Sequence, residues 1–312
     1  MKFSLSTNWC NRRIESGEEI ADKATELGFD GLELGFHTTD LQAEGFKKRL
    51  DRMPVGSVHA FCPVPISAPH GYPELYQLAS FDEEMRKMAQ IMIRRNIAFA
   101  AEMGATALVL HAGRVYRESL FTRMLPNRFA KGFLEKNRIA RGLKMIDVLK
   151  KELEALVPEL EKNHVKLGLE NLPYPEGFPN LSEVSSVVGD WVRPWFDTGH
   201  WYALGKLEGG GVGELESFGA STSQPSNCST FQPLGFHLND SKGGDDHLAP
   251  GDGKIDFSMF KAMMENAEHL VLEPNSSVTD DQLRDALARL KNPEFDWKSV
   301  RNPESESLTD RT

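Results

Sequence analysis

The sequence predicts a single-domain α/β fold, a (β/α)8 TIM barrel over residues 1–290, followed by a polar tail over residues 291–312. Short apolar segments alternate with helical segments without a break in composition, as expected for a parallel sheet that is buried on both faces. The alternation gives eight strand–helix repeats, which is the number that closes a barrel. A doubly wound open sheet would need a glycine-rich phosphate turn after the first strand, and Asn8-Trp9-Cys10-Asn11 is not such a turn.

In the first half of the chain, apolar runs predict strands over residues 3–7, 31–36, 55–59 and 107–111. The first expected helix covers residues 16–27, because Ile20, Ala24 and Leu27 recur at helical spacing and Ser16 is a good N-cap. Further helices are expected over residues 41–53 and 81–103. The loop over residues 61–80 contains four prolines, and loops of this length in compact domains are often functional.

In the second half, strands are expected over residues 165–170, 192–196, 234–240 and 269–273. Helical patterns cover residues 137–162 (one long helix or two shorter ones), 181–188, 201–218, 257–266 and 279–290. The Pro- and Gly-rich residues 171–180, the Ser- and Thr-rich residues 219–232 and the Gly- and Asp-rich residues 241–256 are expected to be loops.

Composition narrows the class of protein. The net charge of -10 and the pI of about 5.5 argue against a protein that coats nucleic acid. No apolar run reaches 18 residues, and no signal-type segment opens the chain, so a cytoplasmic protein without a membrane span is expected. Cys10, Cys62 and Cys228 are widely spaced and odd in number, which indicates reduced thiols. The oligomeric state stays open, with a homo-oligomer among the alternatives.

Side chains that can bind a metal end or follow six consecutive expected strands. They are His59, His111, Glu170, Asp197 with His200, His237 with Asp245 and His247, and Glu273. In a barrel all strand carboxyl ends open on one face, so we expect these side chains to converge. Crowded carboxylates repel one another unless a cation neutralises them, and the set therefore predicts a divalent metal centre.

Each of these residues also has a simpler interpretation as a stray polar strand end. Asp197 could cap a helix that carries His200 on its first turn, with Gly199 allowing a sharp turn of the chain. The remaining histidines are expected away from the metal, His37 and His70 in loops and His164 and His269 at the opposite barrel face.

The chain resembles the xylose-isomerase-like TIM-barrel superfamily over residues 1–290. The most specific segments are Glu170-Asn171, Asp197-Thr-Gly-His200, His237-Leu-Asn-Asp-Ser-Lys242, Asp245-Asp-His247 and Gly251-Asp-Gly-Lys-Ile-Asp256. That superfamily includes sugar isomerases and epimerases and also endonuclease IV, the type-2 apurinic endonuclease.

The sugar branch implies one divalent cation (Mn, Co, Mg or Zn) held by four residues: Glu170, Asp197, His237 and Glu273. In this branch Glu170 and Glu273 would transfer a proton next to a polarised carbonyl. Contacts with the substrate would come from His200, with His59, His111 and Lys242. The loop over residues 61–80 would cover the pocket.

The endonuclease branch implies three zinc ions, with five further ligands: His59, His111, His200, Asp245 and His247. We favour the sugar branch and a small sugar-derived substrate, and do not expect DNA as a partner. The chain is acidic, its loops show no basic and aromatic pattern for entering a duplex groove, and the segment from His237 to Asp245 is short. The alternatives are an endonuclease IV-like zinc phosphodiesterase on abasic DNA, a metal-dependent dehydratase or lyase, and a non-catalytic metal-binding barrel.

Overall fold

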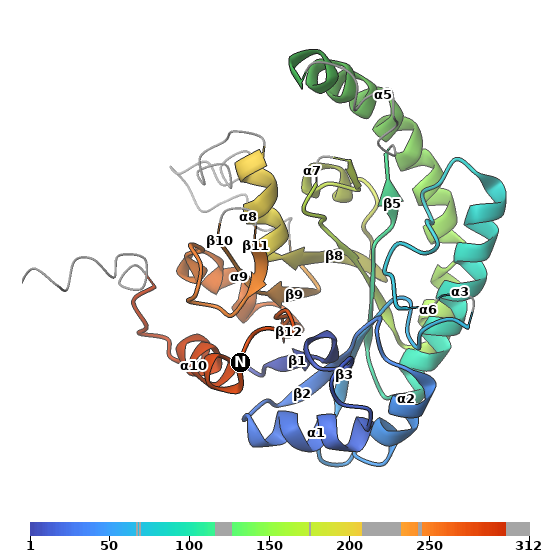
Figure 1. The fold of residues 1–312 in the computed structure, drawn as a ribbon. Coiled ribbons are helices and arrows are strands. Elements are labelled where there is room, and N and C mark those ends of the chain that lie inside the picture. The colour runs from blue at the N-terminus through green and yellow to red at the C-terminus, as the bar shows by residue number, and fades with distance from the viewer. Residues whose placement is uncertain are drawn as a thin grey trace, which may run out of the picture.

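A computed structural model describes residues 1–66, 68, 70–115, 127–174, 176–207, 232–242 and 245–297. Eight parallel strands close into a barrel with helices around it (Figure 1), which confirms the predicted (β/α)8 fold. Each strand pairs with its neighbours in the chain, and the last strand pairs with the first. The barrel strands are β1 (Ser4–Ser6), β2 (Gly31–Leu34), β3 (Val55–His59), β4 (Ala107–Leu110), β6 (Lys166–Glu170), β8 (Val192–Asp197), β9 (Gly235–Leu238) and β12 (His269–Leu272).

The helices lie between the strands in the chain and pack outside the barrel (Figure 1). They are α1 (Gly17–Glu26), α2 (Asp40–Lys47), α3 (Glu83–Glu102), α5 (Asn127–Glu154), α6 (Val157–Asn163), α7 (Leu181–Val184), α8 (Thr198–Leu207), α9 (Lys261–Glu265) and α10 (Asp280–Lys291). Short 3-10 turns occur as η1 (Thr7–Trp9) and η3 (Phe257–Phe260).

Capping side chains set several helix starts. Ser16 caps α1 by accepting a hydrogen bond from the backbone N–H of Glu19 at 3.3 Å, as predicted. The helical segment expected over residues 137–162 is two helices, and Pro158 lies in the first turn of α6, where its missing N–H has no intrahelical role. The helix expected over residues 41–53 is shorter, because α2 ends at Lys47. Helix α8 starts three residues earlier than expected and is described to Leu207.

Two small antiparallel sheets occupy segments that, apart from Asp240 at the end of an expected strand, the sequence predicted to be loops. Strand β5 (Gly113–Arg114) pairs with β7 (Gly177–Phe178), and β10 (Asp240–Lys242) pairs with β11 (Asp245–Leu248). Two to four residues give too little alternation for a strand prediction. Residues 219–231 of the loop expected over residues 219–232, and residues 208–218 of the helix expected over residues 201–218, lie outside the described residues.

The Trp195 side chain fills part of the barrel interior. It forms a cluster with Ala107, Val109, Leu234 and Val271, which come from other strands or their ends. The indole needs glycine at two facing positions. A Cβ at residue 168 would lie 2.8 Å from the ring, and one at residue 235 would lie 2.5 Å from it. This packed layer fills the barrel interior below the carboxyl ends of the strands.

The chain past α10 returns to the barrel. Trp297 is buried and contacts Phe257, with ring centroids 4.8 Å apart. The rest of the polar tail, residues 298–312, lies outside the described part of the chain, as does Cys228. Cys10 and Cys62 are buried free thiols. In the described segments no helix has the length and apolarity of a membrane span.

Candidate metal centre

Four residues from four neighbouring parts of the barrel meet at its carboxyl-terminal mouth. Glu170 and Asp197 end β6 and β8, His237 lies in β9, and Glu273 follows β12. Each offers one ligand atom, and these atoms lie within 4.8 Å of one another. His237 Nδ1 is 3.3 Å from Glu170 Oε1, 3.8 Å from Asp197 Oδ2 and 3.1 Å from Glu273 Oε2. All four side chains are buried.

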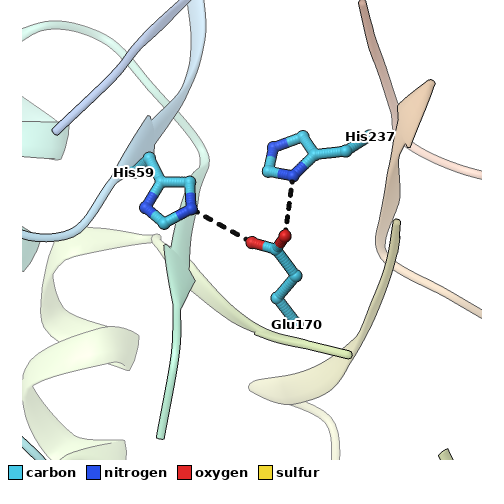
Figure 2. A group of neighbouring side chains, drawn as sticks. All are labelled: His59, Glu170 and His237. Carbon is cyan, nitrogen blue, oxygen red and sulfur yellow. Dashed lines mark hydrogen bonds and ion pairs between the residues drawn. The ribbon is translucent and has the colours of Figure 1, made fainter. Parts of the chain in front are cut away.

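Histidines hold the outer oxygen of Glu170. His59 Nε2 lies 3.0 Å and His111 Nε2 lies 3.2 Å from Glu170 Oε2. Figure 2 shows Glu170 between His59 on one side and His237 on the other. The other ring nitrogen of His59 is 2.9 Å from the backbone oxygen of Ala60. Since both nitrogens of His59 have partners, this ring orients Glu170.

Glu33 on β2 orients His237 and was missed by the sequence reasoning. Glu33 Oε1 lies 3.0 Å from His237 Nε2, and its other oxygen accepts a hydrogen bond from Ser57 Oγ at 2.8 Å. A carboxylate on the far nitrogen fixes the imidazole so that Nδ1 faces the other three ligands. The available signal was a single carboxylate in the apolar run Gly31-Leu-Glu-Leu34.

Two asparagines hold the other carboxylates, and the sequence reasoning assigned neither of them to the site. Asn239 Nδ2 donates to Asp197 Oδ2 at 2.8 Å, and Asn8 Nδ2 donates to Glu273 Oε1 at 2.9 Å. Asp197 Oδ1 accepts from the backbone N–H of His200 at 2.7 Å, so Asp197 also caps α8. The capping interpretation and the ligand interpretation of Asp197 are therefore compatible.

The chain turns directly from β8, which ends at Asp197, into α8, which begins at Thr198, but the predicted need for the backbone freedom of Gly199 in this turn is wrong. Gly199 lies in the first turn of α8, and it has no positive φ. A Cβ there would lie 1.8 Å from Asn239 Oδ1. Glycine is therefore required because the Asn239 side chain occupies the space beside it.

A second group consists of Asp197, His200 and His247. His200 Nδ1 is 2.9 Å from the Asn171 backbone oxygen, and His247 Nδ1 is 2.9 Å from that of Glu273. The two Nε2 atoms face each other at 3.2 Å. When both Nδ1 atoms donate to these carbonyls, both Nε2 atoms carry lone pairs, and a proton or a cation between them removes the repulsion.

One other predicted site residue, Lys242, lies apart from these groups. Lys242 is exposed on β10 and does not line the cavity described below, and its predicted contact with substrate stays a prediction. The side chain of Asp245 lies outside the described residues. His269 stacks on Trp195 with ring centroids 5.8 Å apart, at the amino-terminal end of β12.

The four-residue group fits a divalent cation. Glu170 Oε1 and His237 Nδ1 are buried and have no hydrogen-bond partner, although they face each other. One imidazole nitrogen with three carboxylate oxygens is a ligand set that zinc, manganese and cobalt accept, and magnesium takes the oxygens. The structure thus leaves lone pairs directed at one point.

The carboxylates at this centre create a negative potential, which favours a bound cation and also shifts the pKa values of the residues there. Burial is the largest influence and acts to raise the pKa of Glu170 and Glu273, but His237 and the other nearby histidines together outweigh it, and the pKa of both carboxyls is lowered, that of Glu170 well below its usual range. Burial acts to lower the pKa of His237, yet Glu273, Glu33 and Glu170 raise it well above the usual value. Burial opposes the same change at His200, where Asp197 and Glu170 raise the pKa to about 10.

A cavity of about 230 Å³ opens above the centre. Glu170, Glu273, His59 and His200 are among the residues that line it on the side of the centre. Its walls include Phe36, Tyr72 to Glu74, Arg114 and Tyr174. Tyr72, Pro73 and Glu74 belong to the long loop over residues 61–80, so this loop forms part of the wall as expected.

The sequence matches the family model described as xylose isomerase-like TIM barrel over residues 21–292. A search of curated protein sequences gives no match. Solved structures with the same fold include a D-tagatose 3-epimerase-like protein, with 21% identity, a TM-score of 0.60, and coverage of 97% of this chain and 98% of the other.

Two further solved structures are similar over nearly their whole length. The 3-keto-D-glucoside 4-epimerase of E. coli is 19% identical, with a TM-score of 0.61 and coverage of 93% of this chain and 99% of that one. The IOLI protein with a bound zinc atom is 14% identical, with a TM-score of 0.62 and coverage of 97% and 98%. At these identities the likeness shows the fold.

Proposed function

This chain belongs to the xylose isomerase-like TIM-barrel family, and we propose that it is a divalent-metal-dependent isomerase or epimerase that acts on a small polyhydroxylated carbonyl compound. The observation that carries the proposal is the pair Glu170 and Glu273. Each has one oxygen held by an outer donor and the other oxygen directed to the centre. Two such carboxylates at one cavity suit the removal and return of a proton.

Glu170, Asp197, His237 and Glu273 would hold the cation. When bound, a divalent cation there polarises a substrate carbonyl and stabilises the negative charge that develops on its oxygen. Manganese, cobalt, magnesium and zinc are the candidates, and the IOLI protein of the same fold is described with a bound zinc atom.

The two glutamates divide the proton transfer. One carboxylate takes the proton from the carbon next to the carbonyl, and the second returns a proton to the opposite face of that carbon or to its neighbour. Return to the same carbon gives epimerisation, and return to the neighbour gives isomerisation. The strands that carry Glu170 and Glu273 are separated by β8 and β9, so the two carboxylates reach the substrate from different sides.

His200 and His111 supply substrate contacts beside this pair. Both line the cavity, and His111 Nδ1 is buried without a hydrogen-bond partner. The loop that carries Tyr72 to Glu74 shields the reacting carbon from water.

Proton exchange in heavy water tests the proposal. We expect deuterium at the carbon next to the carbonyl of a ketose or related sugar when the enzyme is supplied with manganese, cobalt, magnesium or zinc. Glu170→Gln should suppress the exchange, whereas Glu152→Gln, which alters a glutamate paired with Arg86 on the outer helices, should not. No exchange across a broad panel of sugars and sugar acids would refute the proposal.

An endonuclease IV-like phosphodiesterase is the second candidate, and one observation favours it. The Nε2 atoms of His200 and His247 lie 3.2 Å apart, next to Asp197. Their lone pairs could bind a second ion. The number of ions per chain distinguishes the two functions. One tightly bound ion supports the isomerase, and three zinc ions support the phosphodiesterase.

A further inference from the structure

Two buried atoms on the cavity wall lack hydrogen-bond partners. Glu74 is 4% exposed and His111 is 7% exposed. Glu74 Oε1 and His111 Nδ1 form no hydrogen bond within the described structure, and they are 3.8 Å apart, which is too far for a hydrogen bond between them. Both residues line the cavity. A buried polar atom without a partner is costly, so a group that enters this cavity and forms a hydrogen bond with either atom is stabilised there.

The hydrogen-bonding capacity of the two atoms identifies that group. His111 Nε2 faces a carboxylate oxygen of Glu170 at 3.2 Å. A carboxylate oxygen only accepts, so Nε2 carries the hydrogen and Nδ1 of the neutral ring is an acceptor. Glu74 Oε1 is an acceptor as well. A hydroxyl group has one hydrogen, which it can donate to Glu74 Oε1, and because its oxygen also accepts, it suits His111 in either protonation state.

The charges beside Glu74 argue against the main alternative, an anionic substituent at this position. Among the described residues that line the cavity, Arg114 is the one that carries a permanent positive charge, against three carboxylates. Its Nε donates to Glu74 Oε2 at 2.5 Å, and Nη1 lies 3.7 Å from Glu176 Oε1. Its guanidinium also stacks on Tyr174, 4.0 Å from the ring centre. Arg114 is therefore already neutralised by protein carboxylates and does not serve as an anion anchor.

We propose that Glu74 and His111 form a hydroxyl subsite, and that this enzyme selects uncharged polyhydroxylated substrates over those with a phosphate or carboxylate at that position. The inference rests on the proposed function and specifies its substrate class. The subsite lies one imidazole ring away from Glu170, because His111 contacts Glu170 through Nε2 and the subsite through Nδ1. The recognised hydroxyl is thus on a carbon close to the reacting one.

Equilibrium binding to the metal-loaded protein tests the subsite without relying on turnover. The probes are the hexitol D-glucitol and its 6-phosphate, measured by calorimetry with the wild type, Glu74→Gln and the control Glu152→Gln. We expect the wild type to bind D-glucitol at least tenfold more tightly than the phosphate. Glu74→Gln should bind D-glucitol about tenfold more weakly, as for one lost hydrogen bond to a charged group.

The decisive measurement is the affinity for the phosphate. Removing the Glu74 charge releases Arg114 from its partner, so Glu74→Gln should bind the 6-phosphate more tightly than the wild type does. A merely structural role of Glu74 would weaken both ligands alike. Equal affinity of the wild type for the two probes, or no binding of D-glucitol, overturns the proposal even if the variant does not fold.

The same proteins separate this inference from the proposed function. If ketoses exchange deuterium but the phosphate binds as well as the hexitol, the subsite is wrong and the isomerase stands. If the hexitol preference depends on Glu74 but no sugar exchanges deuterium, the subsite stands and the isomerase is wrong.

Discussion

Replacing Glu33 tests whether the second layer of the centre controls metal affinity. Glu33 is fully buried, and it connects Ser57 to His237 through hydrogen bonds of 2.8 and 3.0 Å. In Glu33→Gln the amide oxygen still accepts from His237, and the amide nitrogen can donate to the Ser57 hydroxyl. The variant therefore removes the negative charge behind the ligand and preserves the hydrogen bonds.

The expected size of each effect depends on which interaction the substitution removes. Loss of a carboxylate behind a histidine ligand lowers metal affinity by about 10- to 100-fold, or about 1.4–2.7 kcal/mol. Exchange of a charged hydrogen bond for a neutral one lowers the free energy of unfolding by about 1 kcal/mol. Glu33→Ala leaves His237 Nε2 and Ser57 Oγ without partners and opens a cavity, so it should cost about 4 kcal/mol or more.

Metal titration by calorimetry gives the affinities, and urea unfolding of the metal-free protein gives the stabilities. Ser57→Ala serves as the matched control, because it removes one hydrogen bond and keeps the Glu33 charge. Its metal affinity should fall only several-fold. If Glu33→Gln binds the cation as tightly as the wild type, the assignment of Glu33 as the group that orients His237 is wrong.

Four further outcomes are expected. Glu273→Gln should lower metal affinity by calorimetry and abolish turnover, and full occupancy with full activity would contradict the ligand set. Gly199→Ala would place a methyl carbon 1.8 Å from Asn239 Oδ1, so unfolding in urea should show a loss of about 2–3 kcal/mol, and an unchanged midpoint would count against it. Asp240→Ala removes the acceptor of four backbone N–H groups between residues 241 and 255. The free energy of unfolding in urea should fall by about 3 kcal/mol. A fall of less than about 1 kcal/mol would show that water replaces the carboxylate. Purified protein should not incise a duplex oligonucleotide with an abasic site, and efficient cleavage that a chelator stops would overturn the preference for sugars.

The sequence alone determined the barrel and the metal-capable residues at its mouth. Short apolar strands alternate with helices, and eight such repeats commonly close into a (β/α)8 barrel. Once the barrel is assumed, a residue at a strand end has a known location. Glu170, Asp197, His237 and Glu273 could therefore be grouped although their contacts were unknown.

Only the tertiary structure decided how these residues are held. Glu33 and His237 are 204 residues apart, and Asn8 and Glu273 are 265 residues apart. No local periodicity connects such pairs. The closed barrel brings β1 beside β12 and so places Asn8 next to Glu273, and it brings Glu33 on β2 to His237 on β9, although these strands are not neighbours. Gly199 illustrates the same limit. Its sequence context indicated a turn, whereas the structure requires glycine because Asn239, from the segment after the next barrel strand, occupies the space that a side chain would need.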